Sequence, residues 1–182
     1  TAVIGRLPEC AVVLGDPNVS RRHAEVRPLA TGWVIADLGS KAWILRTIGE
    51  GESLPVIKGF FYLTLGFNRG AIFGSLTWLP ATARYVLFAL AGLAALVYFG
   101  RLFLARETPA WERFALGLIL GGAMGNGIDR LYRGAVVDFL DFVFGTWHYW
   151  TFNLADSFIL VGAILYGLRM ILAPKVEPHK KE

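Results

Sequence analysis

Cysteine is almost missing from this sequence. The chain of 182 residues has a single cysteine, Cys10, so an intrachain disulfide is excluded and a cysteine-based metal site is not expected. Charged residues are also scarce, at 18% of the chain, compared with about 25% in an ordinary soluble domain. Residues 1–27 lack a basic start followed by an apolar run, so we expect no cleavable signal peptide there.

The positive charges do not form a nucleic-acid interface. The formal net charge is +4, but the lysines and arginines lie beside apolar blocks and form no stripe with interleaved exposed aromatic residues. Orientation in a membrane explains them better, because basic residues gather on the cytoplasmic side of membrane proteins. We therefore expect no nucleic-acid partner, and membrane lipid as a contact.

The apolar residues form long blocks that predict membrane-spanning helices. We expect four spans, at about residues 28–45, 83–104, 112–131 and 153–173. The first is short and contains Asp37 and Lys41, whereas the third is rich in glycine in its second half, which permits close helix packing. Residues 47–82 contain the strand-like runs FFYLTLGF and AIFGSLTWL, so they predict a β-rich extracytoplasmic section. Residues 132–152 are aromatic-rich and return to the same side.

The basic residues support an orientation with both termini in the cytoplasm. Four spans place three basic segments on the cytoplasmic side, and six cations remain on the other side, so the bias is modest. The cytoplasmic group contains Arg6, Arg21, Arg22, Arg27, Arg101, Arg106, Arg113, Arg169, Lys175, Lys180 and Lys181.

Several ionisable residues fall near the predicted extracytoplasmic ends of these spans, where each costs about 2.5–3.5 kcal/mol on insertion scales. Asp129 and Arg130 are adjacent, and a helix-end ion pair explains them as well as a functional role does. Asp138 lies in the apolar segment VVDF, and Asp156 lies one turn into the fourth span. The loop between them leaves one helix end and returns to the next, so it can bring both carboxylates together at the membrane surface.

The residues near this pair restrict its chemistry. His148 is the one histidine close by, and a zinc site needs three or four ligands, so we expect no metal and no cofactor. No serine has a plausible histidine and aspartate partnership. Two close carboxylates share a proton, so one can activate a water while the other donates to a carbonyl oxygen. Spacing alone supports this chemistry only weakly.

Four segments resemble the motifs of lipoprotein signal peptidases, in that family's order. They are DLGSK (37–41), NRGAIF (68–73), GGAMGNGIDR (121–130) with VVDF (136–139), and FNLAD (152–156). The similarity runs from about Val34 to the C-terminus. It implies four transmembrane helices with a small extracytoplasmic β-cradle, in a multi-pass protein of the bacterial cytoplasmic membrane. It also implies an aspartyl endopeptidase that cleaves diacylglyceryl-modified prolipoproteins before the lipidated cysteine, at the extracytoplasmic face. We expect a monomer.

The same resemblance assigns the site residues. It places the catalytic aspartates at Asp138 and Asp156. Asn126 and Asn153 either bind the peptide backbone or hold the aspartates, whereas Asp37 and Lys41 share a helical face and are expected to pair or to brace the cradle. The residues expected to bind substrate or support the site are Asn68, Gly70, Asn126, Asp129, Arg130, Asn153, Asp37 and Lys41.

The N-terminal segment, up to about residue 40, resembles a different family. Gly5-Arg6 and the run from Ser20 to His23 resemble part of a forkhead-associated domain, a β-sandwich that binds phosphothreonine. In this resemblance, the residues that bind the phosphate would be Arg6 and Ser20. We therefore divide the chain into a truncated forkhead-associated-like segment, 1–27, and a peptidase domain, 28–182. Where the two resemblances meet, at GWVIADLGS, we expect a helix, because a bilayer demands an internally satisfied backbone.

Two alternatives to an active peptidase follow from this hybrid beginning. One is a peptidase-like membrane protein inactivated by the altered first helix. The other is a membrane-tethered phosphothreonine-binding module.

Overall fold

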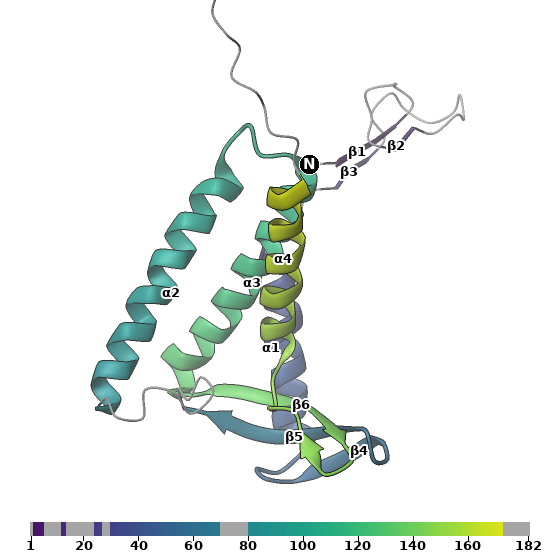
Figure 1. The fold of residues 1–182 in the computed structure, drawn as a ribbon, viewed down its shortest axis with the longest axis vertical. Helices are drawn as coiled ribbons and strands as arrows, with labels where there is room; N and C mark the ends of the chain where they lie inside the picture. Colours follow the sequence, from purple (N-terminus) through teal and green to yellow (C-terminus); the bar gives the residue numbers. More distant parts are fainter. Residues whose placement is uncertain (1, 6–11, 14–23, 27–29, 70–79, 173–182) are drawn as a thin grey trace, which may run out of the picture.

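The computed structural model describes residues 2–5, 12–13, 24–26, 30–69 and 80–172. The described residues form four helices that alternate in direction, with a sheet across one end of them (Figure 1). The helices are α1 (Ala30–Thr47), α2 (Ala81–Leu104), α3 (Ala110–Arg133) and α4 (Leu154–Leu172). All four predicted helical segments are therefore helices, with ends that differ from the expected ones by a few residues.

Helix α1 settles the conflict at GWVIADLGS, because this segment is helical throughout. Of the described helices, α4 is the one long and apolar enough to cross a membrane on length and composition. Residues Ala89–Leu104 of α2 form a shorter apolar stretch. Helices α1 and α3 carry the polar residues of the site described below, which lowers their apolar content. The number of four spans stays a prediction.

Glycines bring α3 close to two other helices. A Cβ atom added at Gly121 would lie 2.9 Å from the Ala30 carbonyl oxygen of α1, and one at Gly122 would collide with the Ala155 carbonyl oxygen of α4. These two positions therefore need glycine for the packing of α1, α3 and α4. The prediction that the glycine-rich half of this helix permits close packing is confirmed.

A four-stranded antiparallel sheet lies at the end of the helices where α1 and α3 finish (Figure 1). Its order is β4 (Ser53–Ile57), β5 (Phe61–Asn68), β6 (Val136–Phe144) and β7 (Trp147–His148). Strand β5 confirms the prediction for FFYLTLGF, whereas the second run, AIFGSLTWL, lies outside the described residues. Strand β6 was not predicted, although its valines and phenylalanines are typical strand formers.

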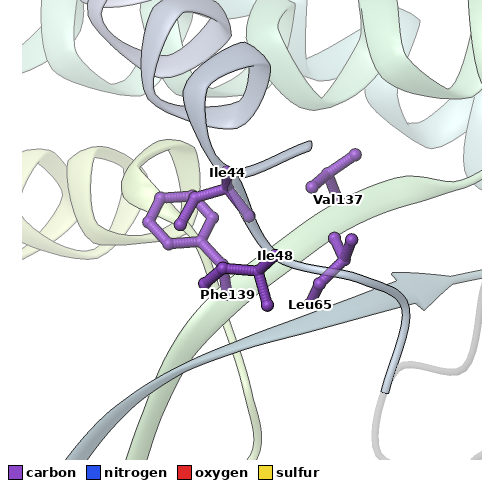
Figure 2. Packing of buried hydrophobic residues seen from close by; sticks show 5 residues of the cluster. All are labelled: Ile44, Ile48, Leu65, Val137 and Phe139. Atoms are coloured by element: carbon purple, nitrogen blue, oxygen red, sulfur yellow. The ribbon is translucent and has the colours of Figure 1, made fainter. Parts of the chain in front are cut away.

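A small hydrophobic core joins the end of α1 to the sheet. Ile44 of α1 and Ile48, the residue just after this helix, pack with Leu65 of β5 and with Val137 and Phe139 of β6 (Figure 2). Because side chains alternate along a strand, burying Val137 and Phe139 on this face directs the residue between them to the other face. That residue is Asp138.

The N-terminal residues form a separate small sheet of order β2-β1-β3. Strand β1 (Ala2–Gly5) pairs in parallel with β2 (Val12–Val13) and antiparallel with β3 (Ala24–Val26). It lies near the beginning of α1, away from the four-stranded sheet (Figure 1). Arg6 and Ser20, the residues expected to bind phosphate, lie outside the described residues.

Candidate active site

Helix α3 and strand β6 bring the first polar residues to the sheet end of the molecule. Asn126 and Asp129 lie one turn apart near the end of α3, and the helix stops at Gly134, whose φ of 69° is a left-handed conformation that favours glycine. The chain then enters β6 and reaches Asp138, which is only 6% exposed. Asn68 of β5 pairs with Val136, two positions from the Gly66–Asp138 pair, so Asn68 and Asp138 share one face of the sheet.

Strand β6 also holds the beginning of α4. The backbone N–H groups of Phe139 and Leu140 donate to the Phe152 carbonyl oxygen at 2.9 and 2.7 Å, and the Phe152 N–H donates back to the Leu140 carbonyl oxygen at 3.1 Å. The next residue, Asn153, precedes the first residue of α4. These bonds therefore place the start of α4 directly beside Asp138.

Asn153 and Asp156 cap α4 reciprocally. The Asp156 N–H donates to Asn153 Oδ1 at 3.0 Å, and the Asn153 N–H donates to Asp156 Oδ2 at 3.3 Å. This is the arrangement of a capping box, in which two otherwise unpaired N–H groups at a helix start are satisfied. A third is satisfied from α1, because the Ala155 N–H donates to Asp37 Oδ1 at 3.0 Å. The carboxylate of Asp156 is thus part of the structure of its own helix.

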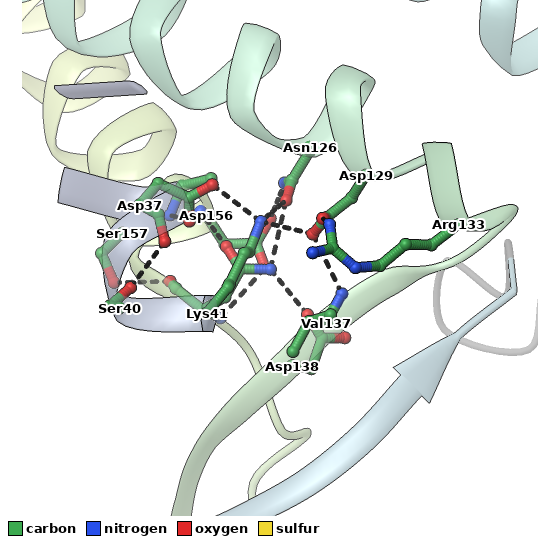
Figure 3. Close-up of polar contacts among 12 residues, drawn as sticks. Asp37, Ser40, Lys41, Asn126, Asp129, Arg133, Val137, Asp138, Asp156 and Ser157 are labelled. Atoms are coloured by element: carbon green, nitrogen blue, oxygen red, sulfur yellow. Dashed lines mark hydrogen bonds and ion pairs between the residues drawn. The ribbon is translucent and has the colours of Figure 1, made fainter. Parts of the chain in front are cut away.

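Lys41 lies at the centre of the polar network (Figure 3). Its ammonium lies 2.8 Å from Asp37 Oδ2, 2.9 Å from Asp129 Oδ2 and 3.0 Å from Asn126 Oδ1. These three contacts use all three donors of a lysine. Lys41, Asp37 and Asp129 are each 0% exposed, so removing one of these charges would leave its partners buried without compensation.

Asp129 connects this network to the start of the sheet. Its Oδ1 accepts from Arg133 Nη1 at 2.5 Å, and its Oδ2 accepts from the Val137 N–H at 3.2 Å. The helix-end ion pair considered for Asp129 is therefore present, with Lys41 and Arg133 as its partners. Within the described part of the chain, the Arg130 guanidinium forms no hydrogen bond or ion pair.

Two asparagine amides connect the network to the aspartate pair. Asn126 Nδ2 donates to Asp156 Oδ1 at 2.7 Å, and Asn153 Nδ2 donates to Asp138 Oδ1 at 2.6 Å. Asn153 Nδ2 also donates to Asn126 Oδ1 at 3.2 Å. Of the two roles considered for these asparagines, the structure provides the second: they hold the aspartates.

The two aspartates have different surroundings. Burial and the neighbouring Asp156 charge raise the pKa of Asp138 from 3.8 to about 6, although hydrogen bonds from Asn153 and Asn68 and the charge of Lys41 act in the opposite direction. Asp156 is only partly buried and lies in the first turn of α4, where the helix dipole favours a negative charge. Asp138 is therefore the better holder of a shared proton.

Comparisons with known proteins assign the chain to a family. The family model described as signal peptidase (SPase) II matches residues 29–172. The chain belongs to the signal peptidase II family. Two similar relatives carry the name lipoprotein signal peptidase. The chain is 45% identical to the one from Ralstonia nicotianae, with 73% of this chain and 76% of the relative covered. The protein of Nitratidesulfovibrio vulgaris is 38% identical, with 90% and 99% covered.

Solved structures agree with the signal peptidase II assignment. Two similar chains, both described as bacterial membrane enzymes, superpose with TM-scores of 0.70 and 0.65 at 30% and 34% identity. The first similarity covers 84% of this chain and 92% of the other, and the second covers 80% and 91%. The family model of the FHA domain also matches, over residues 2–45. It overlaps the signal peptidase II match across most of α1.

The structure brings together most of the residues expected to form a signal peptidase II site. Asp37, Lys41, Asn68, Asn126, Asp129, Asp138, Asn153 and Asp156 form one connected group of hydrogen bonds and ion pairs. Gly70 lies outside the described residues. Sequence reasoning missed Arg133, which follows Asp129 by four residues on the same helical face, a spacing at which opposite charges pair. The prediction named Arg130, three residues earlier, as a site residue instead.

Metal ions in proteins are held by clusters of ligand side chains. Among the described residues, no group of three or more histidine, cysteine, aspartate and glutamate side chains is arranged to hold an ion. What the site does offer is two electrostatically coupled carboxylates with fixed amide donors and unequal burial. Such a pair can move protons to and from a reacting carbonyl group and a water.

Proposed function

We propose that the protein is a membrane aspartyl endopeptidase that removes signal peptides from diacylglyceryl-modified prolipoproteins, cleaving before the lipidated cysteine. The observation that carries this proposal is the position of Asn153, which donates to Asp138 through its side chain and to Asp156 through its backbone. One residue thereby holds two carboxylates together in a family whose similar relatives are named lipoprotein signal peptidases.

The proposed reaction uses Asp156 as base and Asp138 as acid. Asp156, ionised, takes a proton from a water molecule, whose oxygen attacks the scissile carbonyl carbon. Asp138 donates its proton to the carbonyl oxygen, giving a tetrahedral intermediate. When the C–N bond breaks, the leaving nitrogen takes a proton from the pair, and the products are a carboxylate and a free amine. The raised pKa of Asp138 supports its role, because a carboxyl group with a pKa of about 6 is still partly protonated near neutral pH.

The proposed setting is the extracytoplasmic surface of the bacterial cytoplasmic membrane. We place α1, α2, α3 and α4 across the bilayer, both termini in the cytoplasm and the sheet outside. Exposed aromatic side chains at the sheet support this orientation, since such rings favour the membrane interface: Phe144 is 51% exposed, Trp147 53% and Trp150 60%. Lipidated substrate and membrane lipid are the proposed partners of a monomer.

The test is cleavage of a diacylglyceryl-modified prolipoprotein by the purified protein in detergent. Asp138→Asn and Asp156→Asn should each abolish turnover, because neither amide can exchange the proton. Asp141→Asn is a matched control, since Asp141 lies on the same strand but accepts from Thr64 and lies near His148 instead. Full turnover in either variant of the pair, or its loss in the control alone, would contradict the proposal.

The second family similarity supports no separate function. In that resemblance, GWVIADLGS is a strand of a β-sandwich, whereas in this chain it is part of α1. A sandwich of this kind needs about 100 residues to close two sheets. Phosphothreonine binding through Arg6 and Ser20 stays a prediction, which binding of a phosphothreonine peptide by the wild-type chain and by Arg6→Ala would decide.

A further inference from the structure

The orientation of the Asn126 amide decides what Asp156 receives. In the structure, Asn126 Oδ1 accepts from Lys41 and Asn153, and its Nδ2 donates to Asp156. The reversed amide would face an NH2 group toward an ammonium and a second amide NH2, and an oxygen toward the Asp156 carboxylate. All three contacts would become unfavourable, so one orientation is strongly preferred.

The orientation of Asn153 is fixed separately. Its Oδ1 accepts from the Asp156 backbone N–H, which leaves Nδ2 to donate to Asp138 and Asn126. A backbone N–H cannot act as an acceptor, and neither can a lysine ammonium. The Asp156 N–H on α4 and the Lys41 ammonium on α1 can only donate. They therefore determine the direction of the side-chain hydrogen bonds from Asn126 and Asn153 to the two aspartates.

These hydrogen-bond directions favour the ionised form at Asp156 over the ionised form at Asp138. Its Oδ1 accepts from Asn126 and its Oδ2 accepts from the Asn153 N–H, so a proton on either oxygen would oppose an existing donor. Asp156 is also less buried than Asp138 and lies at the start of a helix. Asp138, whose charged form burial penalises most, is left to carry the proton.

We propose that Lys41 is a positioning residue for the reaction: by fixing the Asn126 amide, it holds Asp156 as the base and leaves the proton on Asp138. Lys41 does this without touching substrate, because it is 0% exposed and its three donors are used within the protein. This inference rests on the proposed function and adds to it the residue that assigns acid and base.

A merely structural role for Lys41 is the alternative, and the buried charges allow the two to be separated. Lys41 and Arg133 balance Asp37 and Asp129. Lys41→Met leaves one buried negative charge in excess, which by itself is expected to destabilise the fold. Asp37→Asn combined with Lys41→Met restores the balance, and the amide introduced by Asp37→Asn keeps an oxygen for the Ala155 N–H. The double variant still has no donor from position 41 to Asn126.

The experiment compares wild type, the double variant D37N/K41M and the control Lys58→Met, which makes the same substitution at an exposed lysine. Folded protein is measured by thermal unfolding in detergent, and kcat and KM are measured on diacylglyceryl-modified prolipoprotein across pH. We expect the double variant to fold and to lose about tenfold to a hundredfold in kcat with little change in KM, as misplaced catalytic groups do. Lys58→Met should match wild type.

The pH profile gives the sharper result. Without Lys41, the Asn126 amide is free to turn and to withdraw its donor from Asp156, so the ionised base loses a hydrogen bond and the acidic limb of the kcat profile should move to higher pH. Loss of the Lys41 charge by itself acts on the other limb, because that charge lowers the pKa of Asp138. A purely structural role would scale kcat with the folded fraction and leave the acidic limb unchanged.

Either wild-type kcat or an unchanged acidic limb in the double variant would overturn the inference. So would a charge-balanced variant that fails to fold, because Lys41 would then be required for packing itself. Absence of turnover in wild type would instead reject the proposed function, and this is measured first.

Discussion

Replacing Asp138 by asparagine should make the folded protein more stable while it destroys the proposed activity. The pKa of Asp138 is raised from 3.8 to about 6, so the folded state holds the proton more tightly than the unfolded state does. Stability is therefore highest below the unfolded pKa and falls as pH rises toward about 6, where the folded protein must ionise this carboxyl. The shift corresponds to about 3 kcal/mol lost near neutral pH.

Asp138→Asn should recover much of that free energy. Asparagine has nearly the same shape, carries no charge and keeps an oxygen to accept from Asn153 Nδ2. Asp138→Ala serves as the control, because it leaves that buried donor unpaired at a cost of about 1–3 kcal/mol. The gain should therefore appear in the asparagine variant and not in the alanine variant.

The assay is reversible unfolding by sodium dodecyl sulfate in mixed micelles, followed by tryptophan fluorescence. Wild type and both variants are compared at about pH 7.5 and about pH 4, on either side of the expected titration. The advantage of Asp138→Asn should be clear at the higher pH and should shrink toward zero at the lower one. Equal stabilities at the higher pH, or an advantage that does not change with pH, would refute the reasoning.

Three further outcomes follow from the packing and the network. Gly122→Ala should lower the melting temperature in detergent, at a cost of about 1–3 kcal/mol, because the added Cβ would collide with the Ala155 carbonyl oxygen. Gly127→Ala, whose added Cβ meets nothing within 4 Å, should be neutral or stabilising in the same melt. Asn153→Ala should lose about 1 kcal/mol through the helix cap and most turnover, whereas Asn153→Ser, which keeps an oxygen for the cap without adding a buried charge, should lose turnover and less stability; equal melting temperatures for the two would contradict this. Arg133→Met should lower the melting temperature by more than Arg130→Met, because Arg133 pairs with Asp129. The expected difference in the free energy of unfolding is about 1 kcal/mol. The reverse order would mean that Arg130, and not Arg133, stabilises the site.

The helices were predictable because their signal is local. Apolar runs mark α2 and α4 directly, and the glycines of α3 indicate its close packing before any partner is known. Helix α1 was harder to predict, because Asp37 and Lys41 interrupt its apolar run. Their spacing of four residues nevertheless allowed the buried ion pair that the structure contains.

Strand β6 was not predictable in the same way. It pairs with β5, from which it is separated by two helices, and nothing local in VVDFLDFVF says which strand covers its edge. The alternation of Val137 and Phe139 inward with Asp138 on the opposite face becomes informative only after that pairing is known. The aromatic character of residues 132–152 led to an interface loop being expected in place of a strand.

The candidate site divides in a similar way. The cost of ionisable groups near membrane depth selects the aspartates, and the resemblance supplies their partners. The direction of each amide and the partner of Asp129 depend on three-dimensional contacts between α1, α3 and α4. Lys41 lies 85 residues before Asn126, and this separation hides their hydrogen bond from any local pattern.

The bond between Asp37 and the Ala155 N–H joins residues 118 positions apart, from the first long helix to the last. During synthesis, the N-terminal part of a chain emerges and begins to fold first. Asp37 therefore lacks its hydrogen bond from Ala155 until nearly the whole chain has been made, although its partner Lys41 is already present. A nascent chain that stops short of α4 has neither Asp156 nor the N–H group that completes the Asp37 site. Under the proposed function, hydrolytic activity therefore cannot arise before α4 has been made, and products truncated before this helix are inactive.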